Sequence, residues 1–151
     1  MRRKTIWLLL ADGQRATAYR YLGADRIPEI EADFDIERMD AKPTRKIVSD
    51  KSGRMKSSAL GRGGTALPGR VDPHEEAELR FLDDIAKKLD AAIKAKRCDV
   101  LILAAPPKAL GHLRQVLSAG ARKIIKAEIA KDLTKTVPAK LAKLVAQQLE
   151  E

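Results

Sequence analysis

Two short, uninterrupted apolar runs constrain the fold of this chain more than any other feature. The first occupies residues 6–11 (Ile-Trp-Leu-Leu-Leu-Ala), within a strand expected over residues 4–11, and the second lies in a strand expected over residues 98–105. Such runs are typical of strands in the middle of a sheet that is covered on both faces. The first run stops at Asp12, too early for the apolar region of a signal peptide or for a membrane span. The runs therefore predict a buried sheet and no membrane segment.

Two further strands are predicted between the first apolar run and residue 40. Asp12-Gly13 is a tight-turn dipeptide, so the strand expected over residues 15–22 pairs back as a hairpin. Residues 27–35 alternate between apolar and acidic side chains, which predicts a half-buried third strand towards the edge of the sheet. The residues of this strand that are expected to face inwards are Ile30, Ala32 and Phe34.

The second half of the chain alternates between helical and strand patterns. Asp72 is a good N-cap, and it precedes a helix expected from Pro73 to about Lys96. Two prolines then end the second apolar strand and open a helix over residues 107–117. Residues 123–130 fit a strand or a helix, and their alternation favours the strand. A last helix is expected over residues 138–149.

This order of elements predicts the fold class. Three strands, a long loop and then helix, strand, helix, strand and helix indicate a single α/β domain over residues 1–151. We expect three layers: a mixed five-stranded sheet, formed by a β-meander followed by βαβ-type units, that is covered by helices. This is the arrangement of the ribonuclease H-like group.

The charge of the chain is concentrated in one segment. The formal net charge is +9, and residues 41–70 contain eight basic side chains and one acidic side chain, a net charge of +7. No period is sustained from about residue 41 to residue 71, which predicts a long basic loop containing glycine. A local excess of cations is typical of a phosphate-rich partner, and the shortage of aromatic residues argues against recognition of bases by stacking. The residues predicted to bind nucleic acid are Lys42, Lys46, Lys51, Arg54, Lys56, Arg62, Gly63, Gly64 and Arg70.

The common signatures of enzymes and metal centres are missing. The sequence has no zinc-type spacing of cysteine and histidine, no Gly-Lys-Ser/Thr phosphate loop and no Gly-x-Ser-x-Gly elbow. His74 and His112 are predicted to be surface residues of helices rather than general bases. Cys98 is the single cysteine, which excludes an internal disulfide and suits a reducing cytoplasm. We therefore predict no catalytic residue, no metal and no cofactor.

A two-metal nuclease is the enzymatic alternative for a fold of this group. Asp12, with Asp33 or Asp132, could supply the carboxylates that such a site needs. No carboxylate lies inside the first apolar run, so the simpler interpretation is preferred. In that interpretation Asp12 completes its turn, Asp33 faces solvent and Asp132 begins a loop.

Several short motifs, spread over nearly the whole chain, carry a resemblance to a known family. They occupy residues 7–13 and 15–16, 61–64, 72–75, 101–107 and 110–111, and 131–134. Together they resemble the bacterial host attachment family, described as proteins required for attachment to host cells. The Gly-Arg-Gly-Gly run at residues 61–64 also resembles the middle domain of the archaeal and eukaryotic class-1 translation release factor.

The release-factor resemblance implies a loop that lies close to RNA. In that family a Gly-Gly-Gln loop enters the peptidyl-transferase centre and positions the water that hydrolyses peptidyl-tRNA. Gly63 and Gly64 match the glycine pair, but Thr65 stands where the glutamine belongs. We therefore expect a cytoplasmic, non-enzymatic module that binds RNA or the ribosome. The alternatives are an indirect regulatory role in attachment to host cells and a residual peptidyl-tRNA hydrolase that uses the Gly-Gly-Thr loop.

Overall fold

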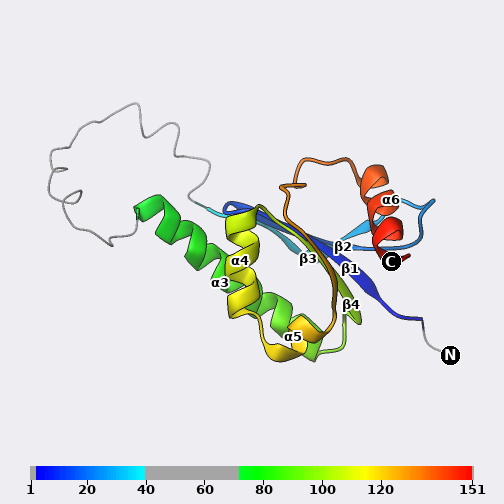
Figure 1. Ribbon diagram of the computed structural model, residues 1–151, viewed down its shortest axis with the longest axis horizontal. Coiled ribbons are helices and arrows are strands. Elements are labelled where there is room, and N and C mark those ends of the chain that lie inside the picture. The colour runs from blue at the N-terminus through cyan, green and yellow to red at the C-terminus, as the bar shows by residue number, and fades with distance from the viewer. Residues whose placement is uncertain (1–2, 40–71, 151) are drawn as a thin grey trace, which may run out of the picture.

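A mixed five-stranded sheet forms the centre of the molecule, as predicted (Figure 1). The computed structural model describes residues 3–39 and 72–150. The sheet has the order β3-β2-β1-β4-β5, in which β1 is antiparallel to β2, β2 is antiparallel to β3, and β4 is parallel to both β1 and β5. The strands are β1 (Ile6–Ala11), β2 (Arg15–Arg20), β3 (Glu29–Glu37), β4 (Val100–Ala104) and β5 (Ile125–Ile129).

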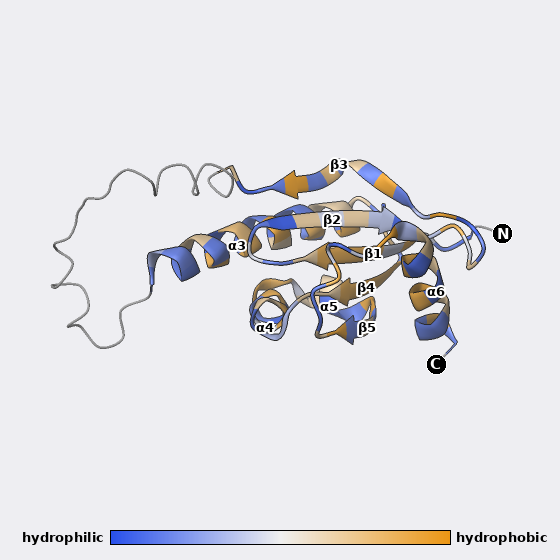
Figure 2. Ribbon diagram, turned by 90° about the horizontal axis from the view of Figure 1, so that it is seen from above, coloured by the Kyte–Doolittle hydropathy of each residue, from blue (hydrophilic) through white to orange (hydrophobic). Residues whose placement is uncertain are grey.

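Helices cover the sheet on both faces, which completes the three predicted layers (Figures 1 and 2). Within residues 3–39 and 72–150, one face carries three helices, and the other carries one helix, which follows β5. The three helices on the first face are α3 (Pro73–Lys94), α4 (Pro107–Val116) and α5 (Ala119–Lys123), and the helix on the second face is α6 (Pro138–Leu149). The α5 helix was not predicted, and Ser118 caps it by accepting a hydrogen bond from the Ala121 amide at 3.1 Å.

The side chains of β1 alternate between two apolar cores. Trp7 and Leu9 pack into the core beneath α3, α4 and α5, while Leu8 and Leu10 pack into the smaller core beneath α6. All four side chains are buried because β1 has a strand on either side and helices on both faces. The uninterrupted apolar run is thus explained by the central place of its strand.

The expected alternation in β3 is correct at one residue and wrong at two. Phe34 is buried, but Ile30 is 46% exposed and Ala32 is also exposed. The cause is a register shift, because Thr17 pairs with Asp35 whereas Tyr19 pairs with Ile30. The additional residues of β3 form a bulge, which interrupts the alternation of inward and outward side chains along the strand.

The bulge turns an acidic residue towards the body of the protein. The Glu31 side chain is only 13% exposed, and it accepts hydrogen bonds from Arg20 at 3.1 Å and Arg97 at 3.3 Å. Arg97 also binds both carboxylate oxygens of Asp33, each at 2.9 Å. The guanidinium of Arg97 therefore connects the chain between α3 and β4 to the edge strand β3.

The Asp33–Arg97 pair predicts a dependence of stability on acid pH. The hydrogen bond from Arg97 is the main reason why the pKa of Asp33 lies below its usual range. A lowered pKa in the folded state stabilises the protein above the unfolded pKa, and this contribution is lost as the pH falls through the folded value. Urea unfolding should therefore show that Asp33→Asn is destabilising at neutral pH, with a difference from wild type that shrinks below about pH 4. In an Arg97→Gln background the same substitution should have no such dependence; equal pH dependence in both backgrounds contradicts the prediction.

Candidate functional site

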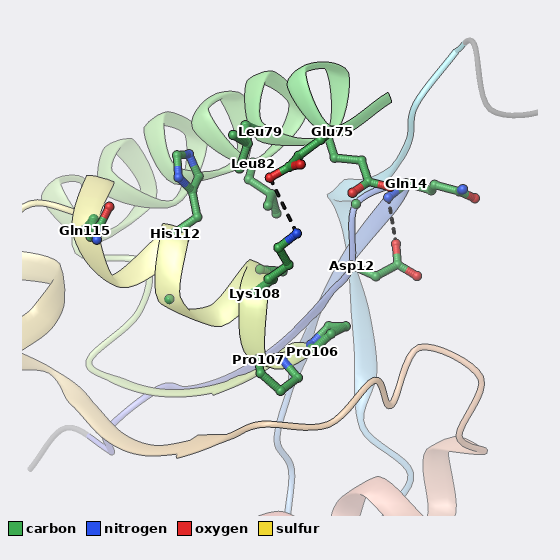
Figure 3. Close-up of a pocket in the computed structure, with 14 residues that line it drawn as sticks. Asp12, Gln14, Glu75, Leu79, Leu82, Pro106, Pro107, Lys108, His112 and Gln115 are labelled. Atoms are coloured by element: carbon green, nitrogen blue, oxygen red, sulfur yellow. Dashed lines mark hydrogen bonds and ion pairs between the residues drawn. The ribbon is translucent and has the colours of Figure 1, made fainter. Parts of the chain in front are cut away.

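A cavity of about 700 Å³ opens between α3 and α4 (Figure 3). It lies where β1 and β4 end, and these parallel neighbours bring their carboxyl ends to one edge of the sheet. Ligands of α/β sheets commonly bind at such an edge. The residues that line it are Asp12, Gly13, Gln14, Glu75, Glu78, Leu79, Leu82, Pro106, Pro107, Lys108, Ala109, Gly111, His112 and Gln115.

The turn after β1 forms one wall of the cavity. Oδ1 of Asp12 accepts hydrogen bonds from the backbone amides of Gln14 at 2.7 Å and Arg15 at 2.8 Å, so Asp12 holds the turn as predicted. Gly13 approaches α3 closely: a Cβ atom at this position would lie 2.5 Å from Cδ of Glu78. A larger residue at position 13 would therefore have to displace the Glu78 side chain from the cavity wall.

The opposite wall is the first part of α4. Pro106-Pro107 ends β4 and begins the helix, and the Leu110 amide donates to the Pro106 carbonyl at 2.8 Å. Lys108, His112 and Gln115 follow at helical spacing and therefore share one side of α4. Nζ of Lys108 lies 3.5 Å from Oε2 of Glu75 on α3, an ion pair that spans the cavity mouth (Figure 3).

His112 was predicted to be a surface residue, but it is largely buried between α3 and α4. Its side chain is only 20% exposed, and its Nε2 atom lies 2.7 Å from Oδ1 of Asp83 on α3. Helical spacing alone assigned it to a polar face, but that face packs against another helix. His74, by contrast, is exposed in the first turn of α3, in agreement with the prediction.

The cavity offers both apolar contact and groups that form hydrogen bonds or carry charge. Its lining mixes apolar side chains with carboxylates, amides, one lysine and one histidine, and none of the lining residues is serine, threonine, cysteine or tyrosine. Cys98 lies elsewhere, in the core beneath α3, and burial raises the pKa of its thiol to about 12. A thiol with such a pKa is protonated at neutral pH and is a poor nucleophile.

The carboxylates of the nuclease alternative each have a local structural partner. Asp12 holds its turn, Asp33 binds Arg97, and Asp132 accepts hydrogen bonds from the amide and the hydroxyl of Thr134 at 3.0 and 2.6 Å. Within residues 3–39 and 72–150, no group of three or more His, Cys, Asp or Glu side chains could hold a metal ion. These contacts agree with the simpler interpretation of the three residues.

The residues predicted to bind nucleic acid all lie outside the described residues. They are Lys42, Lys46, Lys51, Arg54, Lys56, Arg62, Gly63, Gly64 and Arg70. The chain on either side of them borders the cavity. Arg38 binds the β1–β2 turn, where its amide donates to the Gln14 carbonyl at 2.7 Å and its guanidinium donates to the Gly13 carbonyl at 3.1 Å. At the other side Asp72 caps α3, the helix that carries Glu75 and Glu78 into the cavity wall.

The structure of an archaeal translation termination factor resembles this chain, with a TM-score of 0.48 and 14% sequence identity. The likeness covers 97% of this chain and 39% of the archaeal one, so this chain spans less than half the length of that factor. No curated protein matches the sequence. In the part of the chain that the structure describes, no helix is long and apolar enough to cross a membrane.

The family to which the motifs pointed is confirmed over most of the sequence. A family model described as "Protein required for attachment to host cells" matches residues 7–145. This match includes β1 from its second residue, the strands β2, β3, β4 and β5, the helices α3, α4 and α5, and the turn and helix starts that build the cavity. The chain therefore belongs to the host attachment family.

Proposed function

We propose that this protein is a non-enzymatic module that binds RNA, ribosomal RNA included, in the cytoplasm through residues 41–71. The observation that carries the proposal is the charge of this segment: residues 41–70 have a net charge of +7, whereas the whole chain has +9. Each cation that neutralises a phosphate releases counterions, and this release provides affinity that does not depend on base sequence. Contact through the backbone also suits a chain with few aromatic residues.

The surroundings of the cations differ between this segment and the rest of the chain. In the described residues, arginines on or beside the sheet form ion pairs with nearby carboxylates, as Arg15 does with Glu37 and Arg97 does with Asp33. Residues 41–70 contain Asp50 as their one acidic residue. Most of the cations of the segment therefore have no acidic neighbour in the sequence, a pattern that favours a phosphate-rich partner.

Binding to RNA can be tested with two variants that each lose three positive charges. The segment variant replaces Arg54, Lys56 and Arg62 with Gln, and its control replaces Lys87, Lys94 and Lys123, which are exposed on α3 and α5. The probes are a fluorescein-labelled oligouridine of about 20 nucleotides, measured by anisotropy, and purified ribosomes, measured by cosedimentation.

We expect wild-type binding to weaken steeply between about 50 and 200 mM salt. The segment variant should bind oligouridine at least about tenfold more weakly at low salt, with a salt slope reduced by about 2 for three lost contacts. The control should retain both the affinity and the slope of the wild type. Negligible binding at low salt, or a segment variant that behaves like its control, would overturn the proposal.

Specific observations support two other candidate functions. The family match over residues 7–145 supports a part in attachment to host cells, which we propose to be indirect and regulatory. Detection of the intact protein on the outer surface of cells would favour direct attachment instead. Gly63 and Gly64 support the residual hydrolase. It requires turnover of peptidyl-tRNA that is lost in Gly63→Ala, and absence of turnover would remove it.

A further inference from the structure

A second concentration of positive charge lies within the described residues, on the face of the sheet that α6 covers. Residues 129–149 contain four lysines, and Asp132 is their one acidic residue. All four lysines are exposed. The four residues, named the lysine track below, are Lys131 and Lys135 in the β5–α6 loop and Lys140 and Lys143 on α6.

The lysine track differs from the charged surface of α3 in its small number of acidic side chains. The α3 helix has six acidic and four basic side chains, whereas α6 has two lysines and no acidic residue. Across the described ranges, none of the track lysines forms an ion pair, although many other cations do. Those pairs are Arg15 with Glu37, Arg20 with Glu29 and Glu31, Arg80 with Glu76, Arg97 with Glu31 and Asp33, Lys108 with Glu75, and Arg114 with Glu128.

Asp132, the one acidic residue of residues 129–149, is held within its own loop. Asp132 accepts two hydrogen bonds from Thr134, at 3.0 Å from the amide and at 2.6 Å from the hydroxyl. These bonds, with smaller effects of Lys135 and Arg15, lower the pKa of Asp132. The carboxylate of Asp132 therefore interacts mainly within its own loop. Lys135, Lys140 and Lys143 have no acidic residue within two positions in the sequence.

The fold brings the beginning of the track to the edge of the sheet where the basic segment starts. β1, β4 and β5 are parallel, so the β5–α6 loop leaves the sheet at the same edge as the β1–β2 turn (Figure 1). Arg38, the last cation before the segment, is bound to that turn. The small lowering effect of Arg15, at the start of β2, on the pKa of Asp132 agrees with this placement.

The α6 helix presents its part of the track to solvent. Leu141, Ala142 and Val145 face the sheet and are buried. Lys140 and Lys143 lie on the exposed side, about one turn apart. A helix that binds a membrane surface presents an apolar face to the lipid, but the apolar face of α6 is already covered by the sheet. The charge and polarity of the exposed side therefore favour a phosphate backbone over a membrane.

We propose that the lysine track is a second contact surface for the phosphate backbone of the RNA that residues 41–71 bind. The inference rests on the proposed function, and it extends that function from the segment to the folded body. An RNA strand that is bound by residues 41–71 continues over Lys131 and Lys135 and along α6. The track contributes affinity and a part of the salt dependence without reading bases.

The test uses a track variant with the same change in charge as the variants above. It replaces Lys131, Lys140 and Lys143 with Gln and keeps Lys135, because Lys135 interacts with Asp132 in the loop. The control variant again replaces Lys87, Lys94 and Lys123 with Gln. These lysines lie on α3 and α5, which cover the opposite face of the sheet. Binding is measured with the labelled oligouridine of about 20 nucleotides, and circular dichroism verifies that each variant is folded. Vesicles that contain phosphatidylserine form a separate arm.

The track variant is expected to bind oligouridine about three- to tenfold more weakly than the control, with a salt slope smaller by about 2. If wild type and control bind with steep salt dependence and the segment variant is weakened, but the track variant equals the control, the lysine track is refuted and the proposed function stands. If the wild type does not bind at all, the proposed function fails first. Loss of vesicle binding with unchanged RNA binding would assign the track to a membrane and overturn the proposal.

Discussion

Replacing Trp7 with alanine is expected to lower the free energy of unfolding by about 3–5 kcal/mol. The Trp7 side chain is completely buried, and its ring meets the ring of Phe34 edge-on at a centroid distance of 6.1 Å. The guanidinium of Arg97 lies 5.3 Å from the centre of the indole. Alanine would leave a large cavity at the point where β1, β3 and the end of α3 meet. Urea unfolding followed by far-ultraviolet circular dichroism measures the loss.

The substitution Trp7→Phe distinguishes the contribution of packing to stability from the contribution of the indole nitrogen. Among the described residues, Nε1 of Trp7 is buried and has no hydrogen-bond partner. A buried donor of this kind costs about 1–3 kcal/mol, and phenylalanine removes it while it keeps most of the ring volume. We therefore expect Trp7→Phe to cost less than about 2 kcal/mol. A cost equal to that of Trp7→Ala would show that the complete indole is required.

The parts of the fold that the sequence predicted are those that local patterns determine. The run of residues 6–11 could only be stable between strands and beneath helices, and β1 occupies that place. Asp72 and Pro73 predicted the first residue of α3 correctly, because helix capping depends on residues that are neighbours in the chain. The Asp12-Gly13 turn was predictable for the same reason, since its hydrogen bonds join residues 12, 14 and 15.

The parts that were missed depend on contacts between distant residues. The exposure of Ile30 follows from the register of β3 against β2, which no pattern within β3 reveals. The place of His112 in the cavity depends on Asp83, 29 residues earlier on a different helix. The α5 helix has only five residues, too few for a helical period, although Ser118 was a visible capping signal. The cavity itself could not be predicted, because its walls come from three separate parts of the chain.

Leu141→Ala is expected to be the most damaging substitution in α6, at about 2–5 kcal/mol of unfolding free energy. Leu141 is completely buried and packs with Leu8, Leu10 and Ile102 in the smaller core. Among the residues that the structure describes, α6 is the one helix that covers this face of the sheet, so few other contacts there can compensate for the cavity. Hydrogen exchange should show that the amides of α6 lose protection before those of β1. Leu144→Ala is the matched control, because Leu144 lies on the same helix but is only half-buried.

The same pair of variants connects the stability of α6 to the lysine track. Lys140 and Lys143 are held in position by the docking of α6, so a helix that opens more often spends less time in the arrangement that contacts the RNA backbone. Leu141→Ala should therefore weaken oligouridine binding although it removes no charge, whereas Leu144→Ala should preserve it. Both variants are compared at a temperature at which circular dichroism shows them folded. If Leu141→Ala exposes the α6 amides to exchange but leaves the affinity for oligouridine unchanged, the position of α6 does not matter for binding. The lysines of α6 would then act only through long-range electrostatic attraction.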